Sequence, residues 1–151
     1  MDEPEVVQYL LNTEVIPHCL RIMETGTDMS KTVATFIVQK ILLDDVGLNY
    51  VCEKLERFVH VSAALHQMLR GLNPDTNFRL LKQIVKCYHR LSENPLACET
   101  LRKCLPPELS DQSLVSTLRQ QDPVFFQWLN ELQQRVFNTQ GINPMPQTTF
   151  R

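Results

Sequence analysis

Catalysis or metal binding in this chain would have to depend on its cysteines, histidines and paired carboxylates. Neither His18 with Cys19 nor Cys87 with His89 supplies enough ligands, at a suitable spacing, for a four-ligand zinc site. No two cysteines are separated by two residues, as zinc ligands commonly are; the five are Cys19, Cys52, Cys87, Cys98 and Cys104. The spacing therefore predicts no metal site.

The adjacent carboxylates Asp44 and Asp45 could be imagined as a general acid and a general base. Neighbouring residues at a helix end point in different directions, however, and carboxylates there are commonly solvated. The chain also lacks a phosphate-binding loop, a nucleophile elbow and a glycine-rich dinucleotide turn. We therefore expect a protein that is not an enzyme and uses no cofactor.

The most informative polar residues form a basic stripe at steps of three, four, three and one, which places them on one helix face: Arg79, Lys82, Lys86, His89 and Arg90. A solvated basic face is one interpretation. A binding site for an acidic or aromatic-containing peptide is another, because guanidinium and imidazole groups can stack on a tryptophan. Nucleic acid is a third, although so few cations make few phosphate contacts.

Tyr88 lies beside this stripe and is in register with Leu81, Ile84 and Leu91, which predicts a core position. Because a buried hydroxyl needs a hydrogen-bond partner, a half-exposed pocket wall is the alternative. Trp128 is the only tryptophan, and we expect it to pack the last helix against the others.

The elements that must position these residues all have helical periodicity. The chain has only four glycines, and its breaks occur at Gly26, Gly47, Gly71–Asn77 and Pro106–Pro107. The predicted helices cover residues 5–11, 13–24, 28–44, 48–56 (or 48–72 if uninterrupted), 75–93, 95–104, 112–119 and 123–136. They form one domain, 1–137, and we expect 138–151 to be a disordered tail.

Local signals predict how several of these helices begin and end. Gly26 suits a left-handed C′ position, and Asp28 or Ser30 can cap the next helix. Asp45–Gly47 reads as a turn, and Pro95 occupies the first position of a helix. The 28–44 segment is apolar nearly all round, which predicts protein on every side of it.

A shift of 48 residues produces a weak internal repeat of a long helix, an acidic turn, a breaker and a shorter helix. It superimposes Val33 on Leu81, Phe36 on Ile84, Ile37 on Val85, Leu43 on Leu91, Asp45 on Glu93 and Gly47 on Pro95. This period is close to those of armadillo and HEAT repeats. The fold expected is therefore an all-α, right-handed helical solenoid, which offers an extended surface suited to peptides.

The overall composition is that of an ordinary globular protein of the cell interior. Of its 151 residues 43% are hydrophobic, and the net charge of −2 gives no reason to expect nucleic acid or membrane as an obligatory partner. The acidic start does not fit a signal peptide, and no apolar run is long enough to span a membrane. Five cysteines within helical patterns favour a reducing compartment.

Two long segments carry a family resemblance. LLNTEVIPHCLRIMETGTDMSKTVATFIVQKILLDDVGLNYVC and RLLKQIVKCYHRLSENPLACETLRKCLP closely resemble the Rcd-one-like (required for cell differentiation) family, also called Not-nine or Caf-forty. The resemblance covers about residues 5–135 and weakens through 61–78 and after Pro107. It implies an armadillo-repeat adaptor of the CCR–NOT deadenylase complex, without catalytic activity.

The resemblance also implies partners. Such an adaptor docks on the Not-one scaffold and binds tryptophan-containing peptides of regulators of mRNA decay and silencing, with weak or no direct RNA binding. The pocket would include Tyr88 and Arg90 of CYHRLSENP. The expected location is the cytoplasm, including mRNA-decay granules, with the nucleus as a second location. A truncated paralogue with reduced binding is an alternative.

Three departures from the family pattern affect these expectations. His89 replaces an aliphatic residue, with little consequence if it faces solvent, and Gln127 precedes Trp128 where the family has a basic residue. The chain also resembles only the C-terminal half of the solenoid. Its first helix, with Val6, Tyr9 and Leu10, would then expose apolar surface. We therefore expect a homodimer or dependence on a partner.

Overall fold

The computed structural model describes residues 8–73 and 77–138, and every regular element in these ranges is helical. A helical turn at 8–11 comes first. The elements that follow are α2 (Val15–Thr25), α3 (Asp28–Leu43), α4 (Asp45–Glu53), α5 (Leu55–Arg70), α6 (Phe78–Leu91), α7 (Pro95–Cys104), the 3₁₀ helix η1 (Pro107–Ser110), α8 (Gln112–Gln121) and α9 (Pro123–Asn138). The all-α prediction is confirmed.

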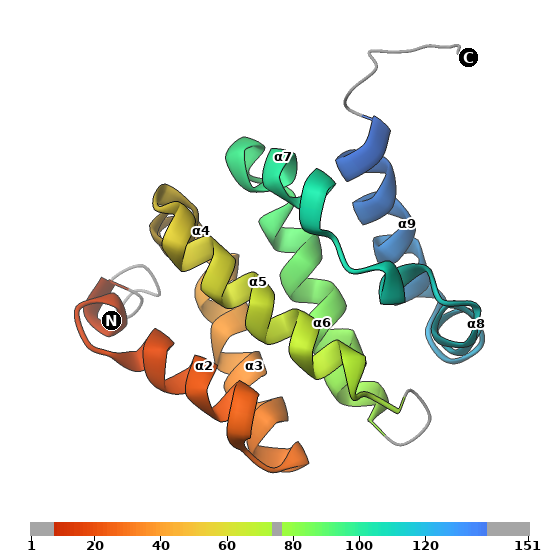
Figure 1. Ribbon diagram of the computed structural model, residues 1–151, viewed down its shortest axis with the longest axis horizontal. Coiled ribbons are helices and arrows are strands. Elements are labelled where there is room, and N and C mark those ends of the chain that lie inside the picture. The colour runs from red at the N-terminus through yellow and green to blue at the C-terminus, as the bar shows by residue number, and fades with distance from the viewer. Residues whose placement is uncertain (1–7, 74–76, 139–151) are drawn as a thin grey trace.

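The helices stack in chain order, as the colour gradient from α2 to α9 shows (Figure 1). α3 packs against α2 on one flank and α6 on the other, and α6 in turn packs against α9. Their shared core is a continuous layer of apolar side chains that includes Met23, Leu42, Leu65, Leu81 and Leu132. A stack of this kind, in which each helix contacts its neighbours, is a helical solenoid.

Side-chain caps explain where several helices begin. Asn94 caps α7 by accepting hydrogen bonds from the amides of Leu96 and Ala97, and Pro95 occupies the first turn as predicted. The predicted cap of α3 at Asp28 or Ser30 is wrong. Thr27, one residue earlier, is the cap, because its hydroxyl accepts a hydrogen bond from the Ser30 amide at 3.2 Å.

Two glycine predictions are wrong, and close packing explains both residues. Gly26 has an extended backbone (φ −79°, ψ 179°) instead of a left-handed one, and a Cβ there would lie 2.7 Å from the carbonyl oxygen of Ile22. Gly47 lies inside α4 instead of in a turn, and a Cβ there would lie 2.0 Å from the carbonyl oxygen of Ile41. The corner between α3 and α4 is therefore a single residue, Asp44.

The region from 48 to 72 forms parts of two helices, so the interrupted alternative holds and the continuous helix is wrong. Lys54 alone is extended (φ −121°, ψ 130°), which ends α4 three residues before the predicted Glu56, and α5 begins immediately after it. No glycine or proline marks this break, which is why periodicity left both alternatives open. After the break, α5 packs against α2.

α3 is not surrounded by protein on every side, contrary to the prediction. Val33, Phe36 and Leu43 are 54%, 43% and 52% exposed, because the stack covers two flanks of the helix and leaves another open.

The internal repeat predicted from the sequence is present in the burial pattern, but the predicted shift of 48 residues was wrong. A shift of 46 residues matches the buried positions Ala34, Thr35, Val38, Gln39, Ile41 and Leu42 to Leu80, Leu81, Ile84, Val85, Cys87 and Tyr88.

The ends of the predicted domain lie at or beyond the limits of the described residues. Of the predicted first helix only 8–11 is described, and α9 continues to Asn138, one residue past the predicted boundary. The predicted start of the 75–93 helix at Asp75 or Thr76 and the predicted tail from 139 onward lie outside the described residues.

Candidate protein-interaction surfaces

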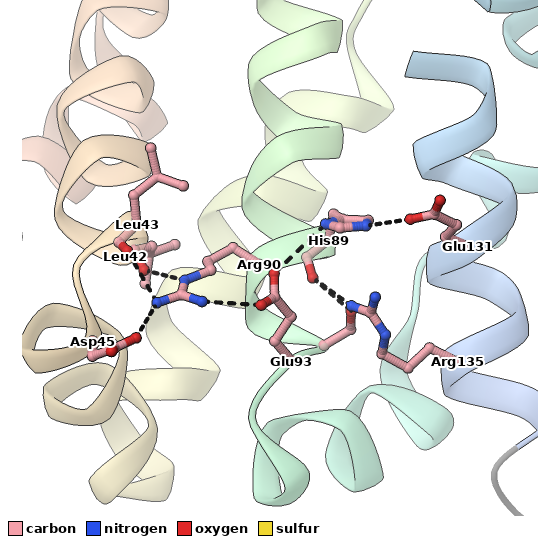
Figure 2. A network of polar contacts seen from close by, with 9 residues as sticks. Leu42, Leu43, Asp45, His89, Arg90, Glu93, Glu131 and Arg135 are labelled. Carbon is pink, nitrogen blue, oxygen red and sulfur yellow. Dashed lines mark hydrogen bonds and ion pairs between the residues drawn. The ribbon is translucent and has the colours of Figure 1, made fainter. Parts of the chain in front are cut away.

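The structure divides the predicted basic stripe of α6 into three parts that face different neighbours. Arg90 reaches toward the corner of α3 and α4, whereas His89 points toward α9 (Figure 2). Arg79, Lys82 and Lys86 line a groove bounded by α3 and α9. The five residues do share α6, but they do not form one ligand surface.

Arg90 joins α6 to the end of α3. Its Nε donates to the carbonyl oxygen of Leu42 at 2.6 Å, and its Nη2 donates to that of Leu43 at 3.0 Å. Its guanidinium also pairs with Asp45 at 2.8 Å and with Glu93 at 3.0 Å. The last carbonyls of a helix have no intrahelical partner, so this side chain satisfies two of them. Only 14% of it is exposed, which leaves little of it for a ligand.

His89 does not face solvent, so the condition under which its substitution would have little consequence is not met. Its side chain is 15% exposed, and its ring stacks on Trp128 with the centroids 5.0 Å apart. Its Nε2 lies 3.1 Å from Oε1 of Glu131 on α9. Together with Arg135, whose Nη1 donates to the His89 carbonyl oxygen at 3.2 Å, it fastens α9 to α6 (Figure 2). Trp128 packs the last helix as predicted.

Tyr88 lies in the core, as the first of the two interpretations predicted, and the half-exposed alternative is wrong. Its side chain is 0% exposed, and its hydroxyl donates to the Ser62 carbonyl oxygen of α5 at 3.3 Å. Burial raises the pKa of this phenol above its ordinary value. Any role of Tyr88 in peptide binding would therefore be to support a surface from beneath.

The remaining residues of the stripe line the first groove, of about 500 Å³, between α3, α6 and α9. Its other lining residues are Thr32, Val33, Phe36, Gln83 and Phe125. The ammonium groups of Lys82 and Lys86 lie 5.3 Å and 5.7 Å from the centre of the Phe125 ring, and Lys86 also lies 5.8 Å from the Trp128 ring. We call this the α3/α6/α9 groove.

A second groove, of about 620 Å³, was not predicted from the sequence. Its walls come from α4, α5 and α7, and its most exposed apolar residues are Leu55 (64%), Val59 (49%) and Leu96 (66%). Leu55 and Val59 are four residues apart, so they share one helix face. Their position outside the buried stripe of α5 is the signal that could have identified them. We call this the α4/α5/α7 groove.

Neither Tyr88 nor Arg90, the two residues predicted for a tryptophan pocket, lines this second groove. The Arg90 charge acts on the Cys52 thiol, which lines the groove, and partly offsets the effect of burial, which raises the pKa of Cys52 to about 11. Tyr88 is hydrogen-bonded to α5, one of the groove walls. Both residues therefore hold its walls in place without lining it.

Catalytic chemistry has little support in the described part of the chain. No cluster of three or more histidine, cysteine or acidic side chains there could hold a metal ion. Burial raises the pKa of the Cys19 thiol and raises that of Cys87 to about 12, so these thiols are poor nucleophiles. Among the described helices, none has the length and apolar character needed to cross a membrane.

Comparison with known proteins identifies the family. The model of the "Cell differentiation family, Rcd1-like" matches residues 1–136. The chain belongs to this family. It is 54% identical over 118 residues to "Cell differentiation protein rcd1" of Schizosaccharomyces pombe, and 49% identical over 119 residues to "Protein CAF40" of Saccharomyces cerevisiae. Each match covers 78% of this chain but only 42% and 32% of these two relatives, so the chain spans less than half their length.

Two features of this Rcd1-like chain concern expectations drawn from the family resemblance. Gln127, at the position where the resemblance implied a basic residue, is exposed on α9 beside the half-buried Trp128. At the other end of the stack Tyr9 is 67% exposed while Leu11 is buried. Self-association through the first helix stays a prediction.

Proposed function

We propose that the chain is a non-catalytic adaptor of the mRNA deadenylation machinery, which docks on the Not-one scaffold and binds tryptophan-containing peptides of decay or silencing regulators. The observation that carries this proposal is the match of residues 1–136 to the Rcd1-like family. An all-helical stack whose described part has open grooves and no cluster of catalytic or metal-binding groups is compatible with binding as the function.

The α4/α5/α7 groove is the surface that best fits a tryptophan side chain. Its exposed apolar residues lie around a cavity large enough for an indole, and Glu53, Glu99 and Lys103 supply a polar rim. A buried aromatic anchor surrounded by a polar rim is the usual arrangement of an energetic hot spot in a protein interface. Tyr88 and Arg90, the residues predicted to form the tryptophan pocket, do not line this groove; Tyr88 contacts α5 and Arg90 contacts Asp45 of α4, two elements that form its walls.

A pull-down from cell extract, analysed by mass spectrometry, tests the adaptor role. We expect the wild-type chain to capture subunits of the deadenylase complex together with regulator proteins. Capture of no deadenylase subunit would contradict the proposal. Tyr88→Asp is unsuitable as the inactive variant, because it would place a carboxylate in the core and unfold the protein.

Leu96→Glu is the better variant for the peptide site, since Leu96 is 66% exposed and the substitution leaves the core intact. Val124→Glu is the matched control: it removes a 60% exposed apolar residue on α9 that lines neither groove. In a fluorescence anisotropy titration with a labelled tryptophan peptide, we expect Leu96→Glu to weaken binding at least about tenfold (about 1.4 kcal/mol). Equal affinities for the two variants would exclude this groove.

A further inference from the structure

The α3/α6/α9 groove has one apolar wall and one cationic wall. Val33 and Phe36 of α3 are 54% and 43% exposed along one side. Arg79, Lys82 and Lys86 of α6 follow the other side, and none of the described residues that line the groove is acidic. The groove shares no lining residue with the α4/α5/α7 groove, so it can bind a ligand independently.

The positive charge of this groove is largely uncompensated. Lys82 pairs with Asp122 at 3.5 Å, but Arg79 and Lys86 make no ion pair within the ranges that the structure describes. Two cations beside a low-dielectric apolar wall attract carboxylates more strongly than cations surrounded by water. The electrostatics therefore favour an anionic ligand.

A polar acceptor without a partner lies in the same groove. Oε1 of Gln83 is buried and accepts no hydrogen bond from the described residues, although the side chain lines the groove. A buried acceptor left unpaired costs about 1–3 kcal/mol. A ligand N–H group, such as that of a polypeptide backbone, would supply the missing donor once the Gln83 side chain turns its amide oxygen toward the groove.

The aromatic rings argue against a single-stranded nucleic acid as this ligand. Nucleic-acid grooves offer free aromatic faces on which bases stack, together with many phosphate contacts. Here Lys82 and Lys86 lie over Phe125, and His89 stacks on Trp128, so these rings already have intramolecular partners. Two unpaired cations are also too few to follow a phosphate backbone.

We propose that the α3/α6/α9 groove binds an acidic polypeptide segment of a partner protein with apolar side chains at intervals along it. Its carboxylates would pair with Arg79 and Lys86, while its apolar side chains would cover Val33 and Phe36. The inference deepens the proposed adaptor function, on which it rests, by adding a second binding site that prefers acidic rather than tryptophan-bearing segments.

The test is a fluorescence anisotropy titration of the full chain with a blocked, labelled peptide Glu-Leu-Asp-Glu-Leu-Phe-Asp-Glu. We expect the double variant Arg79→Glu/Lys86→Glu to weaken binding at least about tenfold (about 1.4 kcal/mol). Added salt should weaken the binding to wild type, because exposed charges are screened. The charge-matched control is Arg21→Glu/Arg70→Glu, two exposed arginines outside both grooves, which should bind as wild type does.

A charge-swapped peptide shows whether the groove variant loses binding through its changed charge or because it fails to fold. The same peptide with lysine in place of every acidic residue should bind Arg79→Glu/Lys86→Glu more tightly than it binds wild type. Phe36→Ala should weaken the acidic peptide several-fold and leave an acidic peptide without Leu and Phe unaffected. The absence of acidic-peptide binding to wild type, or equal losses in the groove variant and the control, would overturn the proposal.

A mixed-sequence single-stranded RNA of similar length serves as the competing ligand. Groove-dependent binding of the RNA without binding of the acidic peptide would overturn the proposal in favour of nucleic acid. Failure of the groove proposal can be distinguished from failure of the proposed adaptor function. If the pull-down captures deadenylase subunits and the peptide does not bind, only the groove proposal fails; if peptide binds but no subunit is captured, only the adaptor role fails.

Discussion

Replacing Arg90 with methionine should destabilise the fold through the main-chain contacts of its guanidinium, more than through its ion pairs. The hydrogen bonds to the carbonyl oxygens of Leu42 and Leu43 come from a charged donor, and such bonds contribute about 1.5–3 kcal/mol each. The carboxylate of Asp45 is 99% exposed, so that pair contributes less than about 1 kcal/mol, as does the partly exposed Glu93.

We therefore expect Arg90→Met to lower the free energy of unfolding by about 3 kcal/mol. For a chain of this size the corresponding decrease in melting temperature is about 10 °C. Arg90→Lys should have an intermediate effect, because an ammonium keeps the charge but cannot reach all four acceptors with the same planar geometry. Asp45→Ala is the matched control and should change stability by less than about 1 kcal/mol.

Urea denaturation, followed by circular dichroism and by Trp128 fluorescence, measures these differences. A loss below about 1 kcal/mol in Arg90→Met would refute the reasoning, since the two carbonyl contacts would then contribute nothing. Equal losses in Arg90→Met and Asp45→Ala would instead assign the stabilisation to the ion pair. A stable Arg90→Met variant that binds no tryptophan peptide would mean that Arg90 contacts the ligand directly.

Three further predictions concern single positions. Gly47→Ala should cost about 2–4 kcal/mol, because its Cβ would lie 2.0 Å from the carbonyl oxygen of Ile41; unchanged urea denaturation would contradict this. Asn94→Ala should cost about 1 kcal/mol by removing the cap of α7, whereas Asn94→Asp should retain most of the stability. The pKa of Cys87 is raised to about 12 in the folded state, above its unfolded value, so the folded protein keeps a proton that the unfolded chain loses. The free energy of unfolding should therefore fall by about 1.4 kcal/mol per pH unit between pH 9 and about 12. In urea titrations over this pH range, Cys87→Ala should show a shallower fall.

The helical periodicity of the chain was enough to identify its fold class and most of its helices. α7 was predicted with its correct bounds, because Asn94 and Pro95 are strong local signals and prolines at 106 and 107 stop the helix. Whether the helix that begins near residue 48 breaks at Lys54 or continues could not be decided from the sequence. It depends on how α4 and α5 pack, and no residue type there disfavours a continuous helix.

The basic stripe of α6 likewise shows which features of the candidate sites local sequence predicts and which depend on the packing of other helices. Its spacing correctly placed five side chains on α6, but whether each one faces solvent depends on the helices that pack against it. Arg90 lies within reach of the end of α3 and becomes part of a helix cap, while His89 meets Trp128 of α9 and becomes part of a packing contact. Only Arg79, Lys82 and Lys86 remain at a groove.

The sequence by itself determined that this protein is a series of amphipathic helices, because helix periodicity, caps and breakers are local properties of the chain. Its membership of the Rcd1-like family follows from sequence similarity over residues 1–136. Only the tertiary structure decided which polar and apolar side chains remain available to a partner. Tyr88 is fully buried while Leu55, Val59 and Leu96 are exposed, and these differences arise from contacts between helices far apart in the chain. Exposure is a property of neighbours in space, which residue spacing along one helix does not specify.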